Sequence, residues 1–298
     1  MGITFALASM LCFALNIFIV RAAMTRVSVS LGFLVGLAVN VLFALLLFAV
    51  ELPLRDTAFT LDWKGVGVFA LSGFVGVYLG RRSMLDAVQL LGPARASVLH
   101  TASPVFTLIG AWILVDERLG VFEMALMALV MLGLWFVQPS SGRGVRAPGF
   151  TPKMLTRAAV LTILTVVYFG FGNAIRGAGI RDWNEPIFGA LVGAATAITC
   201  ELLVSRDWRA RWRALQAADR RGLALYAISG VATASGTMFS SVSMHYIEIA
   251  IATLVGYTTP LVVFPISVLV LRNRESLTLR TACGAVMVLA GIALLALR

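Results

Sequence analysis

Ten apolar stretches follow one another along this chain, and each is long enough to cross a lipid bilayer as a helix. Their approximate bounds are 3–22, 31–50, 65–89, 94–115, 119–137, 158–178, 186–204, 222–246, 248–271 and 277–297. A bilayer core of about 30 Å takes about 20 apolar residues, and lipid satisfies no backbone hydrogen bonds, so each stretch should be helical. Hydrophobic residue types make up 60% of the 298 residues and charged types 13%, which excludes soluble, disordered and secreted disulfide-stabilised classes. We therefore expect an all-α integral membrane protein with ten transmembrane helices.

The two halves of the chain carry matching residues at nearly constant spacing. Between them, residues 138–157 contain three prolines, three glycines and no apolar run, which is typical of a linker. Matches at offsets of 156 to 158 residues fall in the same order in both halves: Asn16 with Asn173, Gly32 with Gly189, Gly36 with Gly193, Gly73 with Gly230, Pro104 with Pro260, Glu117 with Glu275, and Gly133 with Gly291. Each half holds an odd number of helices, so the second copy should be inverted in the membrane. The sequence predicts two inverted five-helix repeats, at 1–137 and 158–298.

A proline ends a polar turn in two matching helices. Residues 97–104 have the sequence SVLHTASP and residues 253–260 have the sequence TLVGYTTP. A proline inside a helix frees a carbonyl about one turn earlier, and freed backbone beside hydroxyl groups at membrane depth usually lines a cavity. The alternative is a packing kink in which serine or threonine satisfies the freed carbonyl. We predict kinks at Pro104 and Pro260 and a ligand site between the halves, with these turns as opposing walls that carry His100 and Ser103 on one side and Tyr257 and Thr258 on the other.

Charged residues interrupt the apolar stretch 65–89. A charge inside the bilayer is costly and usually faces a cavity or an opposite charge. Arg82 and Asp86 are four residues apart on one helical face and are predicted to pair with each other. Arg81 points about 100° away from Arg82 around the helix and is a candidate to meet a ligand carboxylate.

Three further residues are candidates for the same site. Tyr78 lies on the stretch that carries Arg81, and we expect it to contribute a ring and a hydroxyl. Asn16 and Asn173, which match across the repeat, either join neighbouring helices by hydrogen bonds or face the cavity. The paired glycines, in contrast, are expected to serve close helix packing. Residues 205–221 place two tryptophans among six arginines and two aspartates, which favours a short helix on an anionic membrane surface.

Motifs for catalysis and cofactor binding are missing from the sequence. It has no phosphate-binding loop, no H-E-x-x-H and no cluster of histidine and carboxylate for a metal. The three cysteines, Cys12, Cys200 and Cys283, lie in apolar stretches without zinc or disulfide spacing. We expect no catalytic residue, no metal and no cofactor, and a chain that is not an enzyme.

A longer motif spans the fourth and fifth helices and recurs in the second half. Pro104 is followed by Asp116-Glu117-Arg118-Leu119 and then by Gly133, and Pro260 is followed by Glu275-Ser276-Leu277 and then by Gly291. This pattern resembles the EamA-type branch of the drug/metabolite transporter superfamily across essentially the whole chain. More narrowly, the chain looks like the YddG-type bacterial aromatic amino acid exporters. The second half departs from the family pattern because Asn273-Arg274 precedes Glu275.

The resemblance implies a multi-pass protein of the bacterial inner membrane. Its expected activity is secondary export or facilitated movement of small metabolites, with amino acids, and aromatic ones first, as the favoured substrates. A broad drug or metabolite efflux protein is the alternative within transport, and a channel or an intramembrane enzyme are alternatives outside it. The expected partners are a small-molecule substrate and the lipid bilayer, without nucleic acid, and the oligomeric state is open, although a monomer fits.

The membrane orientation has two readings. Basic residues concentrate in the loops after odd-numbered helices, which places both termini outside if basic loops stay in the cytoplasm. The family resemblance instead implies cytoplasmic termini.

Overall fold

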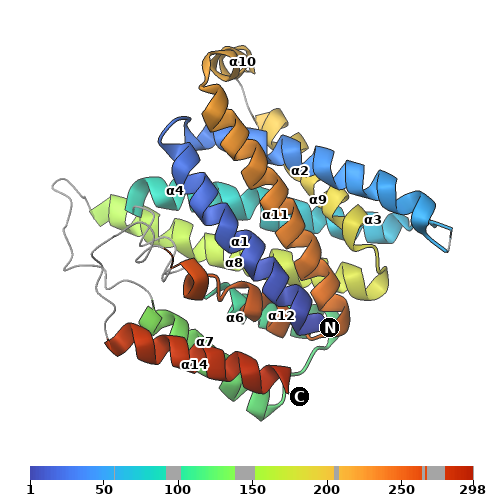
Figure 1. Ribbon diagram of the computed structural model, residues 1–298, viewed down its shortest axis with the longest axis vertical. Coiled ribbons are helices and arrows are strands. Elements are labelled where there is room, and N and C mark those ends of the chain that lie inside the picture. The colour runs from blue at the N-terminus through green and yellow to red at the C-terminus, as the bar shows by residue number, and fades with distance from the viewer. Residues whose placement is uncertain are drawn as a thin grey trace.

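The computed structural model describes residues 1–56, 58–91, 102–137, 152–204, 208–263, 266 and 279–297. Within these ranges the regular structure is entirely helical (Figure 1). The first half contains α1 (Gly2–Met24), α2 (Val29–Glu51), the short 3-10 helix η1 (Leu52–Leu54), α3 (Trp63–Ser72), the π-helical η2 (Gly73–Gly80), α4 (Arg81–Leu91), α6 (Ser103–Val115) and α7 (Val121–Val137). The second half contains α8 (Pro152–Asp182), α9 (Pro186–Val204), α10 (Trp208–Ala217), α11 (Arg220–Tyr246), α12 (Ile249–Gly256) and α14 (Leu279–Ala296).

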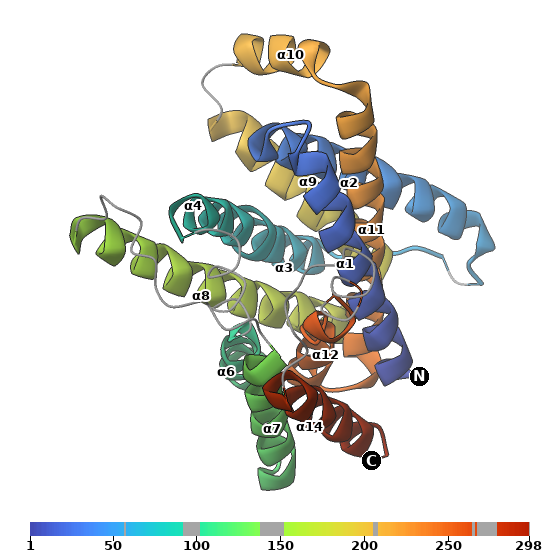
Figure 2. The same cartoon turned by 60° about the vertical axis from the view of Figure 1, so that its left-hand side comes forward.

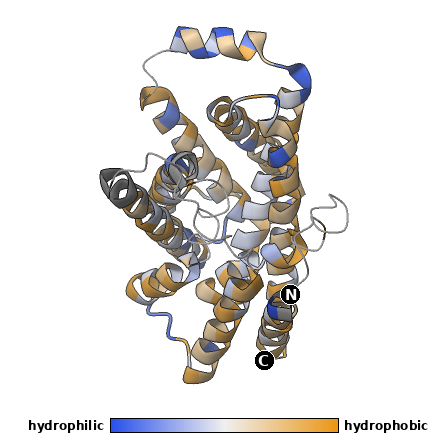
Figure 3. Cartoon of the chain, turned by 90° about the vertical axis from the view of Figure 1, so that its left-hand side faces the viewer, coloured by the Kyte–Doolittle hydropathy of each residue, from blue (hydrophilic) through white to orange (hydrophobic). Residues whose placement is uncertain are grey.

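Apolar helices dominate this structure. Six are long and apolar enough to cross a membrane, with bounds Gly2–Met24, Val29–Leu54, Trp63–Met84, Ala159–Asp182, Pro186–Val204 and Arg220–Tyr246. Four shorter apolar helices have the described bounds Ser103–Val115, Val121–Val137, Ile249–Val263 and Arg280–Leu295. Most residues along these helices are hydrophobic (Figure 3). The all-helical membrane fold is therefore confirmed, whereas ten complete spans remain a prediction. The helix α8 begins at Pro152, inside the segment that the sequence assigned to the linker.

Contacts between the two halves occur in reciprocal pairs. A Cβ built on Gly133 would lie 2.7 Å from Val288, and one built on Gly291 would lie 2.5 Å from Val130. Residues 130 and 133 match 288 and 291 at the repeat offset of 158, so the same contact is made twice with the partners exchanged. Such reciprocity is the property of an interface with approximate two-fold symmetry.

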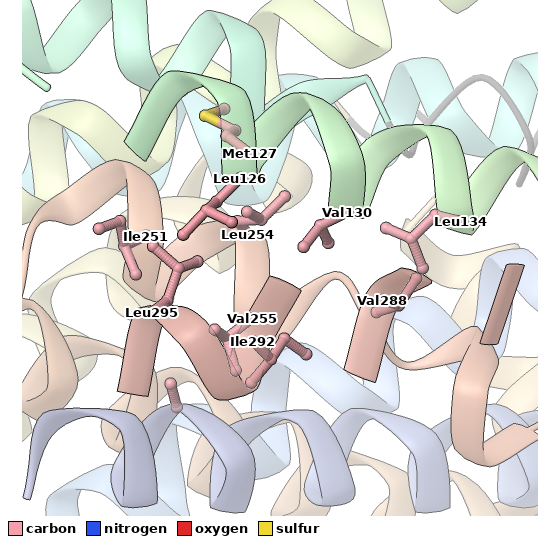
Figure 4. Packing of buried hydrophobic residues seen from close by; sticks show 11 residues of the cluster. Leu126, Met127, Val130, Leu134, Ile251, Leu254, Val255, Val288, Ile292 and Leu295 are labelled. Carbon is pink, nitrogen blue, oxygen red and sulfur yellow. The ribbon is translucent and has the colours of Figure 1, made fainter. Parts of the chain in front are cut away.

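The α7–α14 pair carries the largest apolar cluster. Leu126, Val130 and Leu134 of α7 pack against Val288 and Ile292 of α14 (Figure 4). Residues of α12 and Ala6 of α1 complete the cluster. These contacts join the last helix of each repeat to the rest of the bundle.

The continuous helix formed by α3, η2 and α4 crosses α8 at very close range. A Cβ on Gly76 would lie 3.1 Å from the Cα of Gly172, and a Cβ on Gly172 would lie 2.3 Å from the Cα of Gly76. Gly80 lies beside Phe169. From Gly76 to Gly80 the residue numbers of the contacting partners on α8 decrease from 172 to 169. The two helices are therefore antiparallel at this crossing, in agreement with Figures 1 and 2.

The amphipathic helix α10 lies outside the bundle, across one end of it (Figures 1 and 2). None of its residues is buried, and Trp208 and Trp212 are 46% and 50% exposed. Arg211 ties α10 to the bundle through an ion pair of 2.7 Å with the buried carboxylate of Glu201 in α9. The exposed tryptophans and the basic residues fit the expected position at a membrane surface.

Arg82 differs from its expected pairing. Its guanidinium lies 3.2 Å from the second carboxylate oxygen of Glu201, and no ion pair joins it to Asp86 in the described part of the chain. Glu201 is 2% exposed and therefore needs both cations, since a buried unpaired carboxylate is very costly. Arg82 therefore pairs with the more buried Glu201 of another helix and not with Asp86 on its own helix.

The loop after α2 is tied to the start of α9. Arg55 pairs with Glu185, and it also lies 3.0 Å from Glu51. The hydrogen bond to Glu185 raises the pKa of Arg55. Phe48 and Phe59 lie 5.8 and 5.6 Å from the same guanidinium, which places the ion pair beneath aromatic rings.

Replacement of Gly73 by alanine tests the close packing of the bundle. The new Cβ would lie 2.3 Å from the carbonyl oxygen of Gly193, and backbone is the contact least able to move. We expect Gly73→Ala to lower the free energy of unfolding by about 1–3 kcal/mol. Gly67→Ala is the control, because its Cβ meets no atom within 4 Å. Thermal unfolding in detergent measures both, and equal midpoints for Gly73→Ala and the parent would contradict the proposed packing.

Candidate functional site: a cavity between the repeats

Two half-buried arginines and three neutral polar residues, among a majority of small and apolar residues, line a small cavity between the helices of the two repeats. The volume is about 40 Å³, and one water needs roughly 10–15 Å³ on this measure, so the space suits a few waters or one small polar group. The lining comes from both halves: α2, α3, η2 and α4 from the first, and α8, α9 and α11 from the second. The lining residues are Asn40, Ala44, Phe69, Ser72, Gly73, Val77, Arg81, Arg176, Gly189, Ala190, Gly193, Ala194, Ala234 and Thr237.

Glycine contacts and one ring shape this cavity. Phe69 is 1% exposed, and its ring is wedged against Gly179 of α8 and Gly189 of α9. Ser72 donates a hydrogen bond of 2.8 Å to the carbonyl of Gly172, which fixes its side chain to α8. These contacts hold the helices at the separation that leaves the cavity open.

Arg176 joins the cavity to a second polar group of side chains. Its Nη2 donates to Asn173 Oδ1 at 2.9 Å and to Ser240 Oγ at 3.2 Å. The side chain of Tyr257 contacts Ser103 and Asn173 and lies near the Arg176 guanidinium. Three residues that the sequence singled out, Ser103, Asn173 and Tyr257, are thus brought together around an arginine.

The remaining candidates lie elsewhere. Thr258 is fully buried, and its hydroxyl donates to the Val255 carbonyl at 2.6 Å and lies 3.1 Å from the sulfur of Met10. Tyr78 is buried among Leu37 of α2 and Ala197 of α9 and does not line the cavity. His100 lies outside the described residues.

Asn16 and Asn173 have different surroundings despite their repeat match. Asn16 accepts a hydrogen bond of 2.5 Å from Ser229 of α11, so it joins α1 to α11. Asn173 is held instead by Arg176 beside the cavity. One asparagine therefore has the contacts of helix packing and the other those of the polar group around Arg176.

The two prolines follow interruptions of their helices rather than lying within unbroken ones. Pro104 is in the first turn of α6, where its missing N–H costs nothing. Pro260 follows the turn Tyr257–Thr259, after which the helix resumes. The hydroxyls of Thr258 and Thr259 donate to the carbonyls of Val255 and Gly256. At this turn the threonines satisfy backbone, as in the packing alternative, and Tyr257 is the residue that reaches the polar group.

The cavity walls differ from the expected ones. The sequence placed the proline turns on opposing walls, but α6 and α12 contribute no lining residue. Ser103 and Tyr257 reach the cavity only through Asn173 and Arg176. Arg176 lies within the apolar stretch 158–178 but was not among the predicted site residues, although an arginine three residues after Asn173 on one helical face was the available indication.

The Asp-Glu pair of the repeated motif connects α6 to α12. Asp116 ends α6 in the left-handed conformation, with φ of 50°, which aspartate tolerates better than most residues. Glu117 then accepts hydrogen bonds from the amides of Ile249 at 2.9 Å and Ala250 at 3.1 Å. Its carboxylate caps the positive end of α12, and Arg181 lies 3.5 Å away.

A two-repeat bundle of apolar helices with two arginines at a shared cavity is typical of a polytopic membrane transporter. The model of the EamA-like transporter family matches residues 1–138 and 156–297. The chain belongs to that family, within the drug/metabolite transporter superfamily, and it carries two copies of the family unit.

One solved crystal structure of a protein has the same fold. Its TM-score is 0.72 at 15% sequence identity, and the match covers 99% of this chain and 98% of the other. No curated protein matches the chain.

Substitution of each of the two matched asparagines distinguishes a role in helix packing from a role in substrate binding. We expect Asn16→Ala to lower the free energy of unfolding by about 1 kcal/mol, since it removes an interhelical hydrogen bond, and to leave substrate affinity unchanged. Asn173→Ala should weaken substrate affinity about fivefold, because it releases Arg176 and Tyr257. Thermal unfolding and transport kinetics measure the two effects, and the reverse assignment of effects would refute this distinction.

Removal of the Glu117 carboxylate tests the cap on α12. Glu117→Ala should cost about 1.5–3 kcal/mol of stability, because two amide donors and an arginine lose a charged partner. Asp116→Asn is the matched control, since asparagine also adopts the left-handed conformation and Asp116 is exposed. Chemical unfolding in detergent measures both variants. A Glu117→Ala protein as stable as Asp116→Asn would show that the cap is dispensable.

Proposed function

We propose that this protein is a secondary transporter that moves small metabolites, amino acids above all, across the bacterial inner membrane. The carrying observation is a cavity that is lined from both copies of the family unit and that places two arginines inside an otherwise apolar bundle. Polar and charged groups at membrane depth are costly and are retained where a substrate uses them. Interrupted helices are a recurrent feature of transporters, and the helix that contains α12 is interrupted at Tyr257–Thr259, next to the side chains around Arg176.

The proposed mechanism is alternating access around this cavity. Ten membrane helices form two inverted five-helix repeats, at 1–137 and 158–298, and the linker between them leads into the first residues of α8. Rocking of one repeat against the other exposes the cavity to each side in turn. The reciprocal contacts of α7 and α14 support this arrangement, because a two-fold interface permits the two repeats to exchange their conformations.

Aromatic amino acids are the favoured substrates within this proposal. Phe69 presents a ring at the cavity, and the half-buried ring of Tyr257 lies in the adjoining polar group. Aromatic pairs contribute about 0.5–1.5 kcal/mol beyond area burial, so these rings discriminate among side chains. The two arginines disfavour the alternative of an exporter for cationic drugs, because like charges repel at low dielectric.

Uptake of labelled amino acids into proteoliposomes tests the function directly. If the protein is a facilitator, we expect aromatic amino acids to enter proteoliposomes faster than protein-free liposomes, both with and without a pH gradient. A strict requirement for the gradient would instead identify proton coupling. Amino acid uptake at the protein-free rate, together with movement of lipophilic drugs, would favour broad efflux. Single-channel currents would identify a channel.

Replacement of Tyr257 tests its role beside the cavity. Tyr257→Ala should reduce aromatic amino acid transport roughly five- to thirtyfold, because one stacking contact or hydrogen bond is worth about 1–2 kcal/mol. His100→Ala should have an effect of the same size. Tyr246→Ala is the control, since Tyr246 is 53% exposed, stacks on Phe5 and does not line the cavity. Parent rates for both Tyr257→Ala and His100→Ala at normal expression would show that these residues only pack.

A further inference from the structure

Arg81 and Arg176 face the same cavity without an acidic partner. Of the described residues that line the cavity, none is aspartate or glutamate. Arg81 forms no ion pair or hydrogen bond with the described residues, and Arg176 bonds only to the neutral side chains of Asn173 and Ser240. The buried Nε of Arg176 has no hydrogen-bond partner there. The surface that remains accessible on these half-buried side chains therefore includes the cavity wall.

The contrast with the neighbouring Arg82 shows that this absence of acid is particular to the cavity. Arg82 points to another helix face, where the buried carboxylate of Glu201 neutralises it together with Arg211. Arg55, at the end of the bundle, is likewise matched by Glu185 and Glu51. Arg82 and Arg55 thus have the acidic counter-ions that Arg81 and Arg176 lack among the described residues.

The antiparallel crossing explains how two distant arginines reach one cavity. Gly76 of η2 meets Gly172 of α8, and Arg81 and Arg176 follow these glycines along helices of opposite direction. The arginines consequently approach the cavity from opposite sides of the crossing. A guanidinium is always charged, and a desolvated pair of like charges is stabilised most simply by an anion between them.

We propose that the cavity between Arg81 and Arg176 binds the carboxylate of a small organic substrate. This assignment rests on the proposed transport function and names the chemical group that the central site recognises. Arginine presents its N–H donors in a planar fork that matches a carboxylate. Ser72 and Thr237 also line the cavity, but their hydroxyls donate to the carbonyls of Gly172 and Thr233, so the donors for a carboxylate come from the two arginines. The volume of about 40 Å³ accommodates the carboxylate group, and the rest of the substrate enters as the helices separate.

Matched pairs of acid and amide test the proposal on the purified full chain in detergent. The probes are phenylacetate with phenylacetamide, and succinate with succinamide, each measured by titration calorimetry. At least one carboxylate should bind about thirtyfold or more tightly than its amide, as expected for a charged partner in a desolvated site. Equal affinity within both pairs, or no binding by any of the four probes, would overturn the proposal.

Variants of the two arginines locate the effect. Arg81→Gln and Arg176→Gln should each abolish the preference for carboxylate over amide, whereas Arg81→Lys should retain part of it. Arg82→Gln is the matched control, since its guanidinium serves Glu201 and not the cavity, and it should keep the parent preference. Thermal unfolding without probe shows which variants fold. A parent-like preference in folded Arg81→Gln and Arg176→Gln would overturn the assignment.

The outcome is distinguishable from failure of the transport function. Carboxylate binding that needs both arginines, in a protein that moves no amino acid into proteoliposomes, would refute amino acid transport and leave the anion site standing. Amino acid uptake combined with equal affinity for acid and amide would refute the anion site alone.

Discussion

The close contact of η2 with α8 at Gly76 and Gly172 is the constraint on which the central region depends. Lipid provides no hydrophobic drive for helices to associate, so small residues that let backbones approach must supply the packing. With built Cβ distances of 3.1 and 2.3 Å, neither position has room for a side chain. The crossing orders the helices that carry Arg81 and Arg176, and it therefore determines that two charges from different repeats share one cavity.

Much of this architecture follows from the sequence because the bilayer restricts the possible answers. Spanning segments must be long, apolar and helical, so their positions can be predicted from hydropathy alone. The repeat matches carry further information, since Gly73 and Gly193 prove to be contacting glycines. Ser103, Asn173 and Tyr257 were selected as polar groups at membrane depth, and depth is what the sequence reports well.

The sequence predicts poorly in which direction a side chain points from its helix and which residue of another helix it contacts. Arg82 was matched with Asp86 because sequence spacing offers only local partners, whereas Glu201 lies on another helix. Thr258 follows Tyr257 directly, yet its hydroxyl returns to its own backbone. Gly36 shows the same limit: it matches Gly193 in the repeat, but a Cβ there would meet nothing within 4 Å. Tertiary packing decides each of these cases.

The repeats are related but not identical in conformation, and the difference bears on the proposed alternating access. A Cβ on Gly73 would lie 2.3 Å from the Gly193 carbonyl oxygen, while the matching Cβ on Gly230 would lie 3.1 Å from that of Gly36. The first crossing is thus the tighter of two equivalent ones. If the repeats exchange conformations during transport, the tight contact must pass to Gly230 and Gly36. Glycine at all four positions is then required by the cycle as a whole, because each crossing must accommodate the closest approach in one of the two states.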